Sequence, residues 1–114
     1  MDISYERIVM QQYKLKRGFK PDIDRIFSVM QECFPTEISR NGKFLETAYG
    51  AMSSIKVWVE NKMLCVETVS DKTITNDDVV MQTNKAFRDF LLKATGYTAK
   101  ERIKNAKKEV GGEE

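Results

Sequence analysis

The stretch IKVWVENKMLCVETV, residues 55–69, decides the fold of this chain. It is the longest run rich in β-branched and aromatic residues, and the polar pair Asn61-Lys62 interrupts it at the middle, which is typical of a β-hairpin. Because side chains alternate along a strand, pairing about this turn makes one face apolar and leaves the other mixed. The expected partners are Val59 and Leu64, Val57 and Val66, and Ile55 and Thr68 on the apolar face, with Trp58 and Cys65, and Lys56 and Glu67, on the mixed face.

Length and composition predict a single globular domain over residues 1–114. The 114 residues are 41% hydrophobic and 32% charged, which suits one folded core. No apolar run approaches the roughly 20 residues that span a bilayer. The first twelve residues carry Asp2, Glu6 and Arg7 and so do not look like a signal peptide. We therefore expect a cytoplasmic protein without a membrane partner.

Two elements are predicted ahead of the central hairpins. Residues 13–17 alternate apolar with basic side chains, which indicates a first strand with Tyr13 and Leu15 inward. Residues 1–11 have no clear period and fit either a helical turn or an extra strand. Apolar residues at spacings of three and four predict a helix over residues 21–34.

Tight turns predict two more strands before the opening hairpin. Asn41-Gly42 joins strands expected near 36–40 and 43–49, because both turn residues tolerate a positive φ. Gly50-Ala51 offers the next turn into the hairpin of residues 55–69. The expected register pairs Ile38 with Leu45 and Ser39 with Phe44.

A long amphipathic helix is predicted after the hairpin, over residues 76–95. Thr75 or Asn76 can cap its beginning, and Gly96 can end it in the left-handed conformation. The chain therefore reads strand, helix, four strands, helix. This order predicts an α+β domain of two layers, in which an antiparallel sheet of four to five strands carries two helices on one face.

The C-terminal segment 98–110 is predicted to form a basic helix. Thr98 and Glu101 have the spacing of a capping box, and a helix is expected over about 99–109. Its apolar stripe is thin, so it needs something to pack on. Residues 111–114 are expected to be disordered.

The composition argues against catalytic and metal chemistry. Histidine is absent, which removes the commonest general base and the commonest transition-metal ligand. Cys33 and Cys65 lie in apolar patterns without the spacing of metal ligands, and a disulfide between them is left open. No glycine-rich phosphate loop occurs. We expect no metal, no cofactor, no catalytic residues and no enzymatic activity.

Basic residues near the two ends of the chain form the first candidate site. Residues 1–20 hold five basic and two acidic side chains, and residues 97–108 hold five basic and one acidic. Cations on a short helix neutralise phosphates, and a neighbouring tyrosine can stack on a base. The plainer interpretation is a solvated charged helix. The candidate nucleic-acid-binding residues are Lys14, Lys16, Arg17, Tyr97, Lys100, Arg102, Lys104, Lys107 and Lys108.

The mixed face of the central hairpin is the second candidate. If the helices cover the other face, then Trp58, Lys56 and Cys65 lie on the open face and offer an interface to a protein partner or a second copy. The alternative is that residues 1–11 or the C-terminal helix cover Trp58. A third hypothesis places a small-molecule or enzyme site between helix and sheet.

Two resemblances accompany these predictions. Residues 94–102, ATGYTAKER, with the segments Lys14–Gly18 and Pro21-Asp22, resemble a family of small uncharacterised archaeal proteins from methanogens over most of residues 12–108. That resemblance implies a cytoplasmic α+β domain and no particular activity. The order of elements is also similar to one half of the TATA-binding protein and to helix-grip domains, which implies helices on one face of a curved antiparallel sheet.

Overall fold

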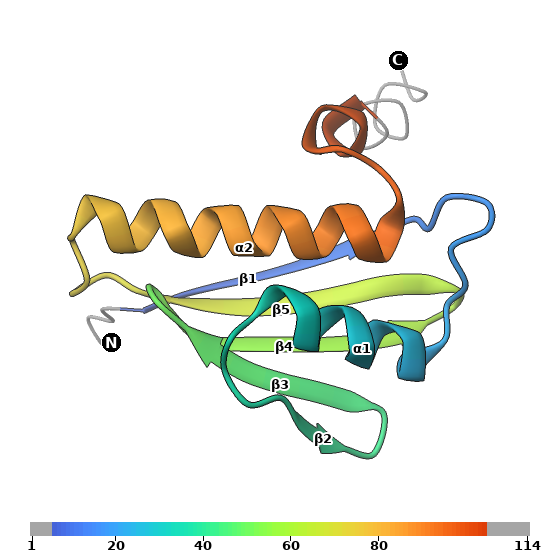
Figure 1. The fold of residues 1–114 in the computed structure, drawn as a ribbon, viewed down its shortest axis with the longest axis horizontal. Helices are drawn as coiled ribbons and strands as arrows, with labels where there is room; N and C mark the ends of the chain where they lie inside the picture. Colours follow the sequence, from blue (N-terminus) through green and yellow to red (C-terminus); the bar gives the residue numbers. More distant parts are fainter. Residues whose placement is uncertain (1–5, 105–114) are drawn as a thin grey trace.

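The predicted two-layer α+β architecture is confirmed in a computed structural model of the chain. The structure describes residues 6–104, except for the side chains of residues 6–9. Figure 1 shows the sheet with both helices on one of its faces. The elements are β1 (Glu6–Tyr13), α1 (Ile23–Cys33), β2 (Ser39–Asn41), β3 (Phe44–Tyr49), β4 (Met52–Glu60), β5 (Met63–Asp71) and α2 (Asp77–Thr95).

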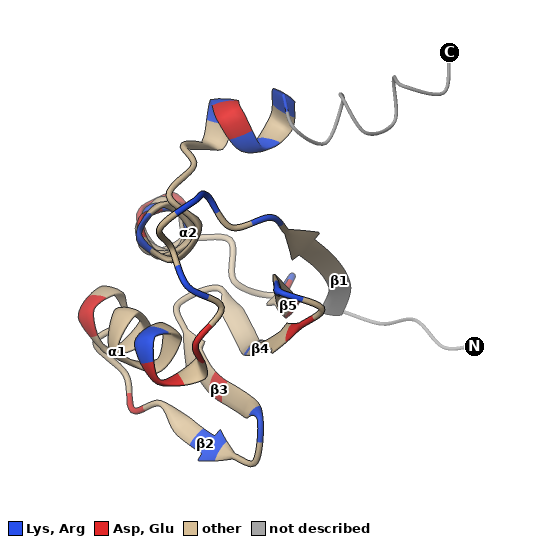
Figure 2. Cartoon of the chain, turned by 90° about the vertical axis from the view of Figure 1, so that its right-hand side faces the viewer, with Lys and Arg blue, Asp and Glu red and all other residues tan. Residues whose placement is uncertain are grey.

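The sheet has five antiparallel strands in the order β1-β5-β4-β3-β2. β2 to β5 form a meander joined by tight turns, and β1 adds to its far edge beside β5. Viewed end-on in Figure 2, α1 and α2 lie side by side on one face of the sheet, and the short helix of residues 99–104 lies beyond α2.

The central hairpin has the predicted register in every pair. Val57 lies opposite Val66, and Trp58 lies opposite Cys65. The two turn residues have φ of 54° at Asn61 and 62° at Lys62, as a type I′ turn requires. The register follows from the apolar alternation, since a slip by one residue would move the whole apolar set to the wrong face.

The predicted first strand over residues 13–17 is wrong. β1 ends where that prediction begins, at Tyr13, which lies opposite Leu64 of β5. The apolar run Ile8-Val9-Met10, in the segment without a clear period, is part of the strand instead. Residues 14–17 leave the sheet, and the backbone N–H of Lys16 donates to the carbonyl of Thr95 at 2.8 Å. The alternation of apolar with basic residues here marks a loop that crosses the end of α2.

The β2–β3 hairpin forms where predicted, but its register differs. Gly42 and Lys43 are the turn residues, and Arg40 rather than Ile38 lies opposite Leu45. Gly42 takes φ of +64°, whereas Asn41 remains in the strand. Ile38 precedes β2 and is buried in the core. Leu45 itself faces the helices, opposite Val57 of β4.

Both helices begin and end close to the predicted residues. The side chain of Asp22 caps α1, and the side chain of Asn76 caps α2 by accepting from the backbone N–H of Val79 at 3.1 Å. Gly96 ends α2 with φ of +83°. The apolar stripes of the two helices pack on the inward side chains of the sheet, which form the core; its fully buried members include Ile26, Met30, Leu45, Ile55, Val57, Leu64 and Phe90.

Candidate functional site

The two basic segments predicted from the sequence meet in space at the C-terminal end of α2. The loop after β1 is tied there by the Lys16–Thr95 backbone hydrogen bond. The ammonium of Lys16 lies 5.9 Å from the centroid of the Tyr97 ring. Residues more than 80 positions apart in the sequence therefore share one surface.

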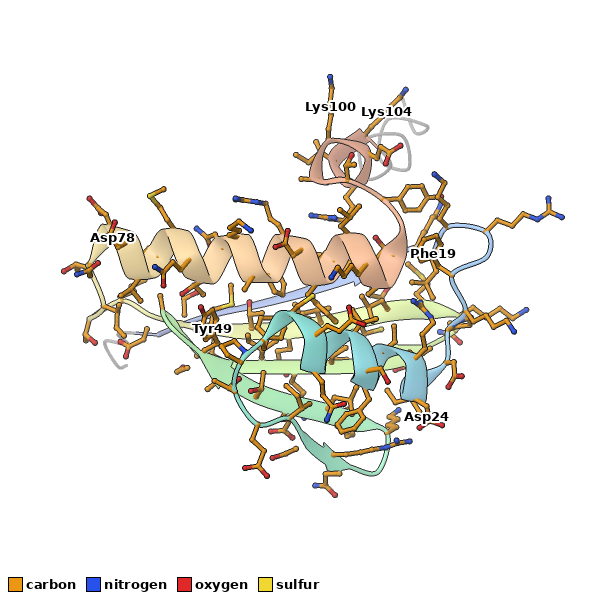
Figure 3. All side chains as sticks on the ribbon, viewed as in Figure 1. Phe19, Asp24, Tyr49, Asp78, Lys100 and Lys104 are labelled. Atoms are coloured by element: carbon orange, nitrogen blue, oxygen red, sulfur yellow. The ribbon has the colours of Figure 1, made fainter. Side chains whose placement is uncertain are left out.

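The turn after α2 is fixed by close packing at Gly96. A Cβ at this position would lie 2.6 Å from the ring of Phe19, and the backbone has a positive φ that favours glycine. The backbone N–H of Tyr97 then donates to the Thr95 hydroxyl at 3.1 Å. Figure 3 shows Phe19 beside the end of α2. This turn directs the chain away from the helix axis and towards β1.

Arg25 of α1 braces the same turn. Its Nη2 donates to the carbonyl of Ala94 at 2.7 Å, which satisfies one of the carbonyls at the end of α2. Its guanidinium also lies 5.6 Å from the ring centroid of Phe19. The end of α2, the loop after β1 and the beginning of α1 thus form one connected unit.

The predicted capping box after this turn is present. The backbone N–H of Thr98 donates to Oε1 of Glu101 at 2.9 Å, and the backbone N–H of Glu101 donates to the Thr98 hydroxyl at 3.2 Å. The hydrogen bond from the Thr98 backbone lowers the pKa of Glu101, and the nearby Lys16 and Lys104 add to that shift. Residues 99–104 are helical, and the rest of the predicted helix lies outside the described residues.

Arg102 joins this helical segment to the sheet. Its Nη1 donates to the carbonyl of Tyr97 at 2.7 Å, and its guanidinium lies 5.9 Å from the ring centroid of Tyr13 at the end of β1. Burial raises the pKa of Tyr13, and the positive charge of Arg102 opposes that rise. Burial also lowers the pKa of Arg102, and the like charge of Arg88 lowers it further.

A partly open pocket of about 500 Å³ lies between β1, α2 and residues 97–103. Three aromatic rings line it: Tyr13 from β1, Phe87 from α2, and Tyr97 from the turn. Leu91 and Ile103 add apolar surface. The pocket lies at the β1 edge of the sheet, between that edge and α2, and the third hypothesis of a site between helix and sheet stays a prediction.

The polar lining of the pocket is cationic. Lys14, Arg88 and Arg102 line it, Gln11 contributes an amide, and among the described residues no carboxylate is part of the lining. Gln12 also borders the pocket, but its amide donates to Sγ of Cys65 at 3.8 Å. Within residues 6–104, neither Arg88 nor Arg102 forms an ion pair with a carboxylate. An anion entering the pocket would therefore meet the positive charges of Arg88 and Arg102, which no carboxylate within residues 6–104 pairs with.

Sequence reasoning missed three of these residues. Tyr13 was expected to face inward from the first strand, and Phe87 was not singled out; both pack against the core, yet both also line the pocket. Arg88 was not singled out either. The available signal in the sequence was its position next to Phe87. Adjacent residues of a helix lie about 100° apart around its axis, so the side chain of Arg88 begins beside the face that carries Phe87.

The remaining predicted cations are exposed or lie beyond the described part of the chain. Lys16, Arg17, Lys100 and Lys104 are exposed, and Figure 3 shows Lys100 and Lys104 pointing away from the fold. Lys14 is exposed and lines the pocket. Lys107 and Lys108 lie outside the described residues.

The second candidate surface, the sheet face around Trp58 that the helices do not cover, is closely packed. Trp58 is 7% exposed and Cys65 is fully buried, whereas Lys56 is half-buried. The ring of Phe44 contacts Trp58 edge-on with centroids 5.5 Å apart, and Nζ of Lys56 lies 4.3 Å from the centroid of the Phe44 ring. The Trp58 indole N–H donates to Oε1 of Glu60 at 3.1 Å. An interface on this face stays a prediction.

The two cysteines are separate thiols. Cys33 is on α1 and Cys65 is on the opposite face of the sheet, and both are free. Burial raises the pKa of each thiol. Among the described residues, no three His, Cys, Asp or Glu side chains gather as a metal site, and no helix is both long and apolar enough to cross a bilayer.

Comparisons with known proteins agree with the fold. The chain is similar to the hypothetical protein TA0095 from the archaeon Thermoplasma acidophilum, whose structure was solved by NMR. The two are 26% identical with a TM-score of 0.62, over 83% of this chain and 95% of that one. A comparison with curated protein sequences gave no significant match. Residues 10–108, which include the resemblance at 94–102, match a family described as Domain of unknown function (DUF5611), and the chain belongs to that family.

Proposed function

We propose that the protein is a non-enzymatic module that binds single-stranded nucleic acid. The observation that carries this proposal is the convergence of two cationic segments around a pocket with three aromatic walls. We call the exposed cations Lys16, Arg17, Lys100 and Lys104 the rim; Lys16 lies beside the Tyr97 ring, and Lys100 and Lys104 belong to the same helical segment as Arg102. These cations suit contacts to phosphates. The similarity to a protein of Thermoplasma acidophilum supports an archaeal source, and we propose the cytoplasm as the place of action.

A single strand suits this surface better than a duplex. Base stacking on aromatic rings needs unpaired bases, and Tyr97 is half-buried with one cation already beside its ring. The pocket is a local hollow beside the short helical segment and not a long groove. A flexible strand can follow the rim from Lys100 to Lys16 and turn its bases inward, which a stiff duplex cannot.

Glu101, an acidic residue close to the rim cations, does not argue against binding of phosphates. Glu101 accepts the backbone N–H of Thr98 and lies near Lys16 and Lys104, so its charge is partly balanced within the protein. The net charge of the whole chain is only +2. Binding is therefore expected to depend on the local arrangement of cations rather than on overall charge.

The test is fluorescence anisotropy with a labelled single-stranded oligonucleotide at several salt concentrations. The full chain is compared with Lys16→Gln/Lys100→Gln, which removes two rim cations, and with Lys43→Gln/Lys72→Gln, which removes two exposed cations elsewhere. Lys43 lies in the β2–β3 turn at the opposite edge of the sheet, and Lys72 follows β5 at the strand end away from Tyr13. Both double variants have the same net charge.

We expect the rim variant to bind more weakly. The slope of log K against log salt should become shallower by about 1.4, because each phosphate contact to a single strand contributes about 0.7. The control variant should keep the affinity and the slope of the wild type. Equal losses in both variants, or no binding at low salt, would overturn the proposal.

The alternative function is a protein-interaction module or homodimer on the face around Trp58. Met10 favours it, because its side chain is 57% exposed and it lies opposite Glu67 on that same face. Sedimentation equilibrium over a wide concentration range tests self-association. A concentration-dependent dimer that Met10→Lys abolishes would support this function, and a monomer throughout would remove the homodimer.

A further inference from the structure

We propose that the pocket holds one nucleotide unit of the bound strand, with its phosphate between Arg88 and Arg102 and its base among the aromatic rings. This inference rests on the proposed function and deepens it. It adds a residue, Arg88, that the sequence did not single out. It also separates the pocket, which receives a base, from the rim, which contacts the neighbouring phosphates.

The size and shape of the pocket fit one unit. Its volume of about 500 Å³ lies within the range of about 300–1,000 Å³ that is usual for small-molecule sites. The walls come from three separate elements, β1, α2 and the turn after Gly96. Because β1 and α2 belong to the packed core, these two walls are positioned before any ligand binds.

The charges favour a phosphate over a neutral group. Arg88 and Arg102 both line the pocket, and the charge of one disfavours the charge of the other. A phosphate between the two guanidiniums would relieve this repulsion and accept charge-assisted hydrogen bonds from both. Arg102 donates one N–H to the carbonyl of Tyr97, and its guanidinium has further N–H donors for contacts to a phosphate.

The apolar walls favour a planar base over phosphate alone. Tyr13, Phe87 and Tyr97 present aromatic surface, and bases stack on such surface at about 1–3 kcal/mol each. Gln11 places one amide at the β1 wall, where its Oε1 accepts from the Tyr13 hydroxyl and its NH₂ group can donate to a base. An inorganic anion would use the arginines and leave most of this wall without a partner.

The test is a titration of the full chain, labelled with ¹⁵N, with three probes: adenosine 5′-monophosphate, adenosine and inorganic phosphate. The reporters are the backbone amides of Gly96, Tyr97 and Arg102. We expect the monophosphate to bind more tightly than either of its parts. Arg88→Gln should weaken binding of the monophosphate by about tenfold or more, because a charge-assisted contact is lost. Binding of adenosine should change little.

The control is Lys85→Gln, which removes an exposed cation from the same helix outside the pocket lining. It should bind the monophosphate as the wild type does, and thermal unfolding of both variants shows that each is folded. If the strand binds but the monophosphate shifts none of the reporters, this inference is overturned and the proposed function stands. Equal affinity in Arg88→Gln overturns the placement of the phosphate. Binding of the monophosphate without any binding of a strand overturns the proposed function and this inference with it.

Discussion

At the scale of single residues, surroundings decide what a predicted side chain does. Trp58 was singled out as a candidate for an interface, yet its indole is almost wholly buried against Phe44 and Glu60. The sequence predicted its partner Cys65 correctly, because pairing follows the alternation along one hairpin. It did not predict contact with Phe44, because that depends on the pairing of β3 with β4, in which Leu45 lies opposite Val57.

Replacing Trp58 therefore tests its packing. Trp58→Ala should lower the free energy of unfolding by about 3–5 kcal/mol, since removal of a large buried ring loses apolar burial and leaves a cavity. Lys56→Gln, on the same face, should change it by less than about 1 kcal/mol. Chemical denaturation followed by far-UV circular dichroism measures both. A loss below about 1 kcal/mol for Trp58→Ala would show that the ring is not packed as described.

At the scale of elements, the turn after α2 places the C-terminal segment. Gly96 and Gly42 both have a positive φ, at +83° and +64°, but only Gly96 is close to another side chain. Gly42→Ala should cost about 1–2 kcal/mol for the left-handed backbone alone. Gly96→Ala should cost more, because its Cβ would collide with the Phe19 ring. Thermal unfolding compares the two variants, and equal losses would contradict the packing at Gly96.

The capping box makes the stability of the helical segment 99–104 depend on pH. The pKa of Glu101 is lowered in the folded protein, so its carboxylate stabilises the segment above the ordinary pKa of glutamate. That stabilisation is lost as the pH falls through the lowered folded-state pKa, where the carboxyl becomes protonated. An NMR titration should find a lower pKa for Glu101 in the wild type than in Thr98→Ala. Identical values would mean that the capping box does not form in solution.

At the scale of the whole molecule, much of the fold could be predicted and the site only in part. Apolar period and turn residues identified both helices, four of the five strands and the capping box, because these are local signals. The first strand was misplaced by a local pattern that resembles a strand but crosses the end of α2. The pocket could not be predicted, since Tyr13, Phe87 and Tyr97 come together only when β1 pairs with β5 and the chain turns at Gly96.

The two basic segments could also be predicted only in part, because their composition is local but their meeting in space is not. Their composition predicted that each could contact phosphates, and the sequence could not tell whether they meet. Their meeting depends on contacts between distant parts of the chain, such as Lys16 with Thr95 and Arg102 with Tyr13. These contacts turn two scattered sets of cations into one surface around one pocket.

Chemical-shift mapping shows whether a single strand binds where these segments meet. A single-stranded oligonucleotide is added to the ¹⁵N-labelled full chain, and the amide shifts are followed residue by residue. The shifts should concentrate at Lys16, Tyr97 and Arg102 and leave Phe44 and Lys56 unchanged. Shifts confined to Phe44 and Lys56, or no shifts at all, would contradict binding where these segments meet.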